Sequence, residues 1–270
     1  MNAAEQTARI KILNAMGLGP LWLSRYASEE VTPVAATLAL ADVPPAAVLP
    51  DGGVTDVVTV ADVTPSSAPV ASDPVDRVSV MSWDALQAEV ASCVACGLCK
   101  GRTKTVFGTG DTAATWLFVG EGPGYNENLQ GEPFVGAAGQ LLDNMLRALG
   151  VQRGERAYIA NVVKCRPTDS RGKDRPPTAD EIQACLPYLQ RQIALIQPKV
   201  IVALGKTAAI ALLGADPDTP VSQLRGKEHH VNGVPMIVTY HPAYLLRKPV
   251  EKSKAWRDLC LAQNALPTNV

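Results

Sequence analysis

The sequence lacks long apolar runs and a leader pattern. No apolar run approaches the ~18 residues needed to cross a membrane, and the N-terminus has no succession of basic, apolar and small residues typical of a signal peptide. We therefore expect a cytoplasmic protein with no membrane partner. In that compartment thiols stay reduced, so the six cysteines are not expected to form a disulfide framework.

Basic and aromatic residues are scarce in residues 28–80. This segment has one basic residue, no aromatic residue and seven prolines, and it shows no amphipathic period of useful length. Such a composition cannot bury enough apolar surface to fold. We predict a disordered linker at 28–80, between a short helical and aromatic segment at 1–27 and a folded domain at 81–270.

The net charge of −1 is unevenly distributed. Residues 1–80 have four Lys and Arg against nine Asp and Glu, whereas residues 81–270 have 21 against 17. The first part therefore has a net charge of −5 and the second a net charge of +4. A mildly basic domain is compatible with a polyanionic partner, although ordinary surface scatter explains the same numbers.

Short apolar runs alternate with helical patterns from residue 82 onward. Runs rich in Val and Ile lie at 115–120, 157–165, 199–205 and 234–242, and helices are predicted at 82–93, 137–150, 178–198 and 206–214. Ser82 is a predicted N-cap, and Thr178 and Glu181 form a predicted capping box. Buried strands separated by helices are typical of α/β proteins. We predict three α/β/α layers around a mostly parallel, four-stranded sheet.

Polar, glycine-rich or proline-rich segments follow each predicted strand. They are Gly120 to Gly124, Asn161 to Pro167, Gly205-Lys206 and His241-Pro242. Because ligands of such sheets bind at the carboxyl ends of the strands, we expect the functional site where these segments meet. The first segment, GEGPG, does not match the Gly-x-Gly-x-x-Gly fingerprint, which disfavours a dinucleotide.

Five cysteines are spaced like metal ligands. Cys93, Cys96 and Cys99 resemble half of a bacterial ferredoxin motif without its Cys-Pro, and Cys165 and Cys185 follow at a strand end and in a helix. Four thiolates drawn from these five would hold either a [4Fe–4S] cluster or a zinc ion. The alternative is a set of scattered buried cysteines with no ligand.

Four longer motifs together resemble one family. They are GEGPGYNENLQGEPFVGAAGQLLDNML at 120–146, NVVKCRP at 161–167, IVALGKTA at 201–208 and HPAYLLR at 241–247. In this order they resemble the iron–sulfur uracil-DNA glycosylases, family 4 of the uracil-DNA glycosylase superfamily. The resemblance covers residues 82–261. It implies a DNA repair enzyme that flips deoxyuridine out of DNA and hydrolyses its glycosidic bond, which releases uracil and leaves an abasic site.

The resemblance also implies a cofactor and its ligands. Cys93, Cys96, Cys165 and Cys185 would hold a [4Fe–4S] cluster with a structural role, and Cys99 would be a bystander. The cluster would fix the basic segment 166–177 where it could meet DNA phosphates, although such segments are as often solvated loops.

Recognition of uracil needs a group that both donates and accepts, because uracil presents O4 as acceptor and N3–H as donor. An amide does both, and Asn161 is the candidate. Phe134 would stack on the flipped base. Backbone N–H groups in the Gly120, Gly122 and Gly124 segment would also contact the base.

Catalysis and DNA contact are assigned to the last motif and its neighbours. His241 would stabilise the charge that develops on uracil O2, as neutral imidazole or as imidazolium. Leu245 would fill the gap left by the flipped nucleotide. Arg247 and Lys248 would contact phosphate, and the turn at 225–227 is a further phosphate candidate.

The carboxylate that positions water is less settled. In other branches of the superfamily an Asp stands where this chain has Gly122. Glu121 and Glu127 are the replacements in the same loop. We favour Glu127 for the water and the cationic sugar, which a carboxylate stabilises electrostatically, and Glu121 for shaping the uracil pocket.

Residues 1–27 suggest a partner. Their pattern of Leu13, Met16, Gly17, Trp22 and Arg25 resembles the N-terminal peptide of the psi subunit of the bacterial replicative polymerase, which implies a clamp-loader contact. A helix that packs on the chain's own domain is the alternative. We otherwise expect a monomer.

Two other functions remain open at this stage. One is a catalytically silent iron–sulfur DNA-binding protein, which the presence of Asn161, Phe134 and His241 argues against. The other is a glycosylase of broader specificity for deaminated bases, since Gly122 and Gly124 leave room near the base. No lysine is evidently placed as a nucleophile, so we expect a monofunctional enzyme.

Overall fold

The structure is a computed structural model, and it describes residues 74–267. The predictions for the segment 1–27 and for most of the linker 28–80 lie outside the described residues. The described part starts with helix α2, Pro74–Ser79, which the sequence placed in the linker. An ion pair between Arg77 and Glu89 joins this helix to the next one. The helical structure thus begins before the expected boundary at residue 81.

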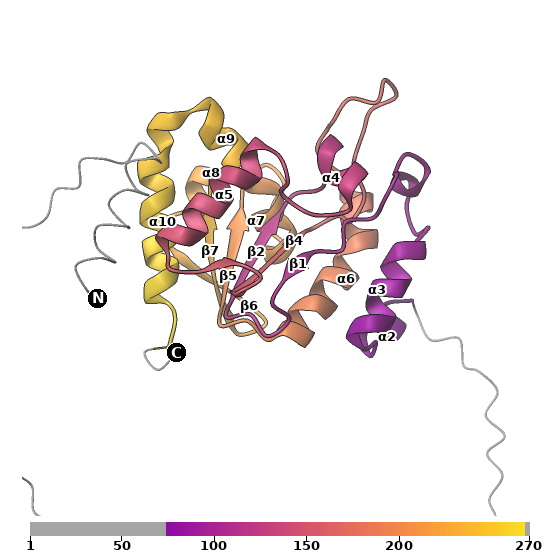
Figure 1. The fold of residues 1–270 in the computed structure, drawn as a ribbon, viewed down its shortest axis with the longest axis horizontal. Helices are drawn as coiled ribbons and strands as arrows, with labels where there is room; N and C mark the ends of the chain where they lie inside the picture. Colours follow the sequence, from indigo (N-terminus) through magenta and orange to yellow (C-terminus); the bar gives the residue numbers. More distant parts are fainter. Residues whose placement is uncertain (1–73, 268–270) are drawn as a thin grey trace, which may run out of the picture. The chain divides into compact units, whose positions relative to one another are not determined.

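A mixed sheet of seven strands forms the centre of the described part (Figure 1). Its parallel core has the order β4 (Arg156–Asn161), β2 (Trp116–Gly120), β5 (Val200–Leu204) and β7 (Val234–Thr239). Short strands extend both edges: β1 (Thr109–Gly110), β3 (Gln152–Arg153) and β6 (Glu228–Val231). The predicted four-stranded parallel centre is confirmed, and edge strands are added to it.

Helices cover both faces of this sheet, because successive side chains of each strand point to opposite faces. Leu117 and Val119 of β2 lie in one apolar core, and Trp116 and Phe118 lie in the other. The first core includes α2, α3 (Trp83–Ser92), α6 (Ala179–Ile196), α7 (Lys206–Leu213) and α8 (Val221–Leu224). The second includes α5 (Ala137–Ala148), α9 (Pro242–Arg247) and α10 (Lys252–Asn264). The three predicted layers are confirmed.

The predicted helix starts are also present. Ser82 Oγ accepts a hydrogen bond from the N–H of Ala85 at the start of α3. At the start of α6, Thr178 and Glu181 form both bonds of a capping box. These side chains satisfy backbone N–H groups that have no partner inside the helix. No helix of residues 74–267 is long and apolar enough to cross a membrane.

The order of the strands determines where a site can form. The chain runs from β2 to β4 on one side and from β5 to β7 on the other, so the order reverses between β2 and β5. Crevices outside the carboxyl ends of strands form at such a reversal. Helix α4 (Tyr125–Gln130) follows β2 at this end, and the short 3₁₀ helices η1 (Gly97–Lys100) and η2 (Pro249–Glu251) lie in connecting segments.

Candidate active site and sulfur pocket

Loops that follow β2, β4 and β7 meet around one pocket, which we call the strand-end pocket. Its wall contains seven residues that the sequence singled out and part of the segment 166–177. The lining residues are Glu121, Gly122, Pro123, Gly124, Glu127, Phe134, Ala138, Asn161, Pro167, Asp174, Arg175, His241 and Ala243. Three of the four predicted strand-end segments line this pocket, and the fourth, Gly205-Lys206, lines an adjoining one that shares Glu121 and His241.

Asn161 ends β4 with an acceptor that has no internal partner. The residue is 2% exposed, and its Oδ1 accepts no hydrogen bond from any group within residues 74–267. A buried acceptor left unpaired costs about 1–3 kcal/mol, so this atom points to a donor supplied by a ligand. Gly120 makes room for it, because a Cβ there would lie 2.4 Å from Asn161 Oδ1 and 2.7 Å from Phe134 Cζ.

Phe134 is presented by a constrained turn. Its φ of 56° lies in the left-handed region, which is unfavourable for a residue with a side chain. The guanidinium of Arg153 fixes the turn by donating to the carbonyls of Pro133 at 2.8 Å and Phe134 at 2.9 Å. The Phe134 ring stacks against the His241 imidazole with 5.5 Å between centroids. The two rings therefore form one wall of the pocket.

His241 precedes α9 and caps it. Its Nδ1 accepts a hydrogen bond from the N–H of Ala243 at 3.1 Å. An accepting Nδ1 places the proton on Nε2, which makes the imidazole neutral and Nε2–H a donor. Burial, assisted by the charge of Arg247, lowers the pKa of His241 to about 4. Of the two forms that the sequence left open, the structure favours the neutral one.

Glu127 lines the pocket and has one carboxylate oxygen held by backbone amides. Its Oε1 accepts from the N–H groups of Val135 at 3.1 Å and Gly136 at 3.4 Å, where α5 begins. These bonds hold the carboxylate in one orientation. Its Oε2 lies beside Gly124, where a Cβ would be 2.8 Å away from that oxygen.

Gly122 and Gly124, which the sequence suggested leave room in the pocket, have neighbours at the position of a side chain. A Cβ on Gly122 would lie 2.7 Å from Cγ2 of Val163. The space beside Gly124 is occupied by the carboxylate of Glu127. Glu121 lines the pocket but bonds through Oε2 to the hydroxyl of Thr207 in α7. The pocket is therefore narrower at this loop than the sequence suggested.

Leu245, the residue predicted to act as the wedge, is buried in helix α9. Leu245 is 1% exposed and belongs to the core that α9 forms with α5, whereas Leu246 is 43% exposed. Successive residues of a helix point about 100° apart, so when one leucine is buried the next can be exposed to solvent. Leu245 is therefore not the exposed apolar residue of this helix, and Leu246 is. Arg247 and Lys248 are exposed beside it, as expected.

In the turn at 225–227, Arg225 is bound within the domain, whereas Lys227 is exposed. Arg225 Nη2 lies 2.8 Å from Oδ1 of Asp258, a side chain that is 1% exposed, and its Nε lies 3.0 Å from Oδ2. The guanidinium also lies over the Tyr240 ring at 5.0 Å. Arg225 thus supports the strand end that precedes His241 instead of offering its charge to phosphate.

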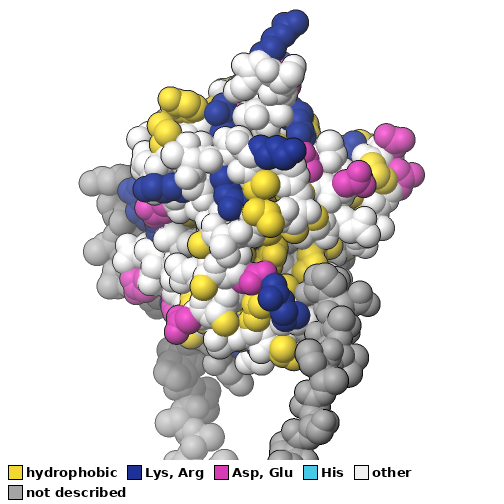
Figure 2. Space-filling model, turned by 90° about the vertical axis from the view of Figure 1, so that its right-hand side faces the viewer, with side chains coloured by type: hydrophobic (Ala, Val, Ile, Leu, Met, Phe, Trp, Pro, Cys, Tyr) yellow, Lys and Arg dark blue, Asp and Glu magenta, His cyan; other side chains and the backbone are white. Residues whose placement is uncertain are grey.

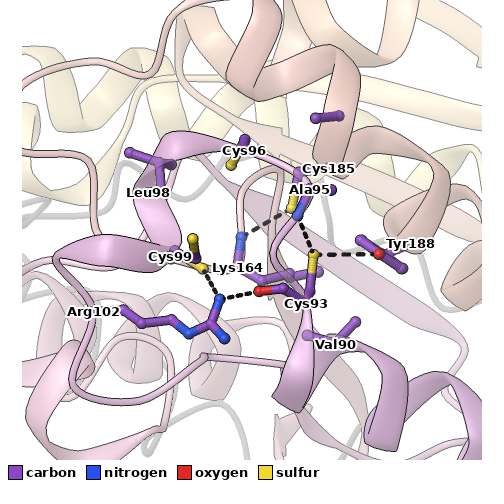
Figure 3. A pocket seen from close by; sticks show the side chains of 12 residues that line it. Val90, Cys93, Ala95, Cys96, Leu98, Cys99, Arg102, Lys164, Cys185 and Tyr188 are labelled. Carbon is purple, nitrogen blue, oxygen red and sulfur yellow. Dashed lines mark hydrogen bonds between the residues drawn. The ribbon is translucent and has the colours of Figure 1, made fainter.

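A second pocket, which we call the sulfur pocket, is lined by five cysteines. They are Cys93 at the end of α3, Cys96 and Cys99 at η1, Cys165 after β4, and Cys185 in α6. Figure 3 shows the sulfurs of Cys93, Cys96, Cys99 and Cys185 around a common space. The sequence elements that carry these thiols therefore meet in space.

Donors surround the sulfurs. Three of the sulfurs accept hydrogen bonds (Figure 3). Tyr188 Oη donates to Cys93 at 3.3 Å, and Arg102 Nη1 donates to Cys165 at 3.5 Å. The backbone N–H of Lys164 donates to Cys185 at 3.3 Å. Such donors stabilise thiolates. Burial acts in the opposite direction: it raises the pKa of the Cys96 and Cys165 thiols and raises that of Cys185 to about 12. A metal bound here has to displace protons from these thiols.

The chemistry of the lining suits a soft metal. Thiolates select zinc or iron–sulfur clusters. Within residues 74–267, no group of three or more His, Cys, Asp and Glu side chains is arranged to hold a metal ion. Four sulfurs on one zinc would each lie about 2.3 Å from it, whereas each thiolate of a [4Fe–4S] cluster binds a separate iron. The donor set of five thiols is thus compatible in its chemistry with zinc or an iron–sulfur cluster.

The basic segment 166–177 is partly structural. Two arginines pair with carboxylates, Arg166 with Asp174 at 2.6 Å and Arg175 with Glu181 at 2.6 Å. Arg171 and Lys173 are exposed. Figure 2 shows one face of the protein, on which Lys and Arg side chains gather in the upper part. Ion pairs therefore hold part of the segment in place, and its other cations are exposed to solvent.

Sequence reasoning missed Lys164. It lies between Asn161 and Cys165 in one motif, but nothing in the sequence shows that its side chain turns inward. In the structure it is 1% exposed and donates to the carbonyl of Asn161 at 2.8 Å and to Oε1 of Gln192 at 2.6 Å. Its ammonium is thus bound to two acceptors, and Lys164 is outside the lining of the strand-end pocket.

The chain belongs to the uracil-DNA glycosylase superfamily, whose model, described as "Uracil DNA glycosylase superfamily", matches residues 107–262. It is 44% identical over 174 residues to the type-4 uracil-DNA glycosylase of Archaeoglobus fulgidus. This aligned region covers 62% of this chain and 85% of the relative. It is 41% identical over 187 residues to the type-4 enzyme of Pyrobaculum aerophilum, which covers 67% and 93%. The type-5 enzyme of the same organism is 31% identical over 150 residues, covering 50% and 64%. Within the superfamily, the chain groups with type 4.

Proposed function

We propose that this protein removes uracil from DNA by hydrolysing the bond between the base and deoxyribose. The observation that carries the proposal is the unpaired Oδ1 of Asn161, buried in a pocket walled by Phe134 and His241. Relatives named type-4 uracil-DNA glycosylases, which this chain matches over most of their length, support the same substrate.

Base recognition follows from the pocket wall. A base inside a duplex is out of reach, so the nucleotide must be flipped out. The flipped uracil stacks on Phe134, a contact worth about 1–3 kcal/mol. The Asn161 amide accepts from uracil N3–H through the unpaired Oδ1 and donates to O4. Cytosine presents the opposite pattern at these two positions and leaves the buried amide unsatisfied.

Departure of the base leaves negative charge on uracil. When the bond between C1′ and N1 breaks, its electron pair passes to the base and spreads onto O2. His241 donates Nε2–H to this oxygen, and the bond that Ala243 makes to Nδ1 keeps the ring in that tautomer. A donor fixed before the reaction stabilises the developing charge without reorganisation.

Water attacks the sugar from the side of the carboxylates. We assign water positioning to Glu127, because it lines the pocket and its Oε1 is held by two amides. The water oxygen bonds to C1′, and the released proton passes to the carboxylate. Glu121, bonded to Thr207, shapes the pocket wall. The negative charge of these groups also stabilises the cationic sugar.

DNA contact is assigned to α9 and the segment 166–177. Leu246 is the exposed apolar side chain that would enter the gap left by the flipped nucleotide. Arg247, Lys248, Arg171 and Lys173 are exposed cations for the phosphates.

The sulfur pocket is assigned to a [4Fe–4S] cluster held by Cys93, Cys96, Cys165 and Cys185. When bound, the cluster supplies a cross-link between α3, the end of β4 and α6. Its role is structural, since it would fix the chain that leads from Cys165 into the wall of the strand-end pocket. Cys99 remains outside the ligand set.

The test is release of uracil from single- and double-stranded oligonucleotides that hold one uracil, followed by alkaline cleavage at the abasic site. We expect scission at uracil only. Scission at hypoxanthine or xanthine would support the broader glycosylase, which the filled space at Gly122 and Gly124 disfavours. No scission on any base, together with retained DNA binding, would support the catalytically silent protein.

A further inference from the structure

Lys164 is a buried cation that the proposed chemistry does not use. Its side chain is 1% exposed, and both acceptors of its ammonium are neutral: the carbonyl of Asn161 and the amide oxygen of Gln192. Placing a charge in the interior is costly unless it is well bonded. The burial of this ammonium therefore indicates a role for its hydrogen bonds in addition to packing.

The bonds of Lys164 reach both pockets. Its ammonium holds the carbonyl of Asn161, whose side chain lines the strand-end pocket. Its backbone N–H donates to the sulfur of Cys185 at 3.3 Å in the sulfur pocket. Asn161 and Cys165, one residue from each pocket, are joined by the same short stretch of chain, and Lys164 lies inside it.

Gln192 extends the support. It is fully buried in α6, the helix that carries Cys185, and its Nε2 donates to the carbonyl of Phe107 at 3.0 Å. The backbone carbonyl of Lys164 accepts from the N–H of Val106 at 2.8 Å. One lysine thus connects the end of β4 both to α6 and to the segment that contains Val106 and Phe107. Lys164 itself also lines the sulfur pocket.

We infer that Lys164 is a positioning residue that sets the orientation of Asn161 by linking its backbone carbonyl to the side chain of Gln192. Lys164 thereby holds the base-recognising amide at a fixed position relative to the sulfur pocket. This inference rests on the proposed function. Without the ammonium, the carbonyl of Asn161 loses its link to Gln192 of α6, and the Asn161 side chain moves with the backbone that carries it.

The experiment compares Lys164→Met, Asn161→Ala and the double variant with the wild-type protein. Methionine keeps the length and apolar stem of lysine and removes the donor. We expect Lys164→Met to slow single-turnover uracil release about 10- to 100-fold, because small displacements of a positioned group have effects of that size. In the double variant the rate should stay within about twofold of Asn161→Ala alone, since both changes act through one amide.

Two further readouts separate positioning from general damage. Affinity for free uracil, measured by calorimetry, should fall in Lys164→Met, while affinity for DNA without uracil and iron content per chain stay near the wild-type values. Ile193→Val, a buried change in the same helix that is outside the Lys164 bonds, is the matched control and should leave the rate unchanged.

Three outcomes would overturn the inference: an unchanged rate, an unchanged affinity for free uracil, or losses that multiply in the double variant. If Lys164→Met does not fold, Gln192→Met and its combination with Asn161→Ala repeat the same cycle from the other end of the bond. A wild-type protein that releases no uracil would instead refute the proposed function.

Discussion

The strand-end pocket and the sulfur pocket are served by one short segment of chain, residues 161–165, yet they are built on opposite principles. In the first, a buried amide oxygen has no partner within the described residues. In the second, three of the sulfurs accept hydrogen bonds from internal donors, and burial raises the pKa of three of the thiols. We interpret the first as a site for a ligand that comes and goes, and the second as a site for a resident group.

The two pockets also differ in where their residues come from. The strand-end pocket uses loops after three neighbouring strands, which the sheet brings together. The sulfur pocket joins α3, η1, the end of β4 and α6 beside one apolar core. Loss of a resident group should therefore damage the fold, whereas loss of a recognition group should damage only turnover. Four sets of variants test this difference.

The largest effect is expected at the sulfur pocket. Cys165→Ala should lose nearly all bound iron and lower the unfolding temperature, because metal binding contributes directly to the free energy of folding. Cys99→Ala, the matched control in the same pocket, should keep both. Iron analysis and thermal unfolding measure the outcome. Retained iron in the first variant, or lost iron in the second, would reverse the choice of ligands.

At the strand-end pocket, Asn161→Ala should lower the rate of uracil release by about 100-fold or more, the usual effect of removing one fixed hydrogen-bonding group from a reacting site. DNA affinity and thermal stability should change little, since the amide oxygen has no internal partner to lose. Single-turnover kinetics and a DNA titration give both numbers. Near-normal turnover would remove Asn161 from the site.

The two leucines of α9 should separate function from stability. Leu246→Ala should slow release from double-stranded DNA about 10-fold, with a smaller effect on single strands, because only a duplex leaves a gap to fill. Leu245→Ala should lower the free energy of unfolding by about 2–4 kcal/mol, as expected for a buried leucine. Denaturant unfolding and release rates on both substrates decide the matter. The opposite assignment of the two effects would restore Leu245 as the wedge.

The smallest effect concerns pH. The pKa of His241 is about 4 in the folded protein, against about 6.5 when unfolded. The unfolded chain therefore binds more protons between these values, and stability falls as pH drops from about 6.5 to about 4, by at most ~3 kcal/mol.

His241→Gln should remove this part of the slope, whereas the exposed His230→Gln should keep it. Denaturant unfolding at several pH values measures the difference. Equal slopes in wild type and His241→Gln would show that the ring titrates normally.

Much of the framework was predictable because its signals are local. Four apolar runs predicted the parallel strands, and side chains such as Ser82, Thr178 and Glu181 marked helix starts. The cysteine spacing indicated a shared ligand. These patterns depend on neighbouring residues, so they can be read along the chain.

The set of elements, their order, and the residue types that reach the carboxyl ends of the strands could thus be derived from the amino-acid sequence alone. The directions of the side chains emerged only from the folded chain: Leu245 is buried and Leu246 is not, Arg225 pairs with Asp258, and Lys164 lies between the two pockets. The reason is physical. The direction of a side chain and the identity of its partner depend on packing between segments far apart in sequence, and a motif does not record that packing.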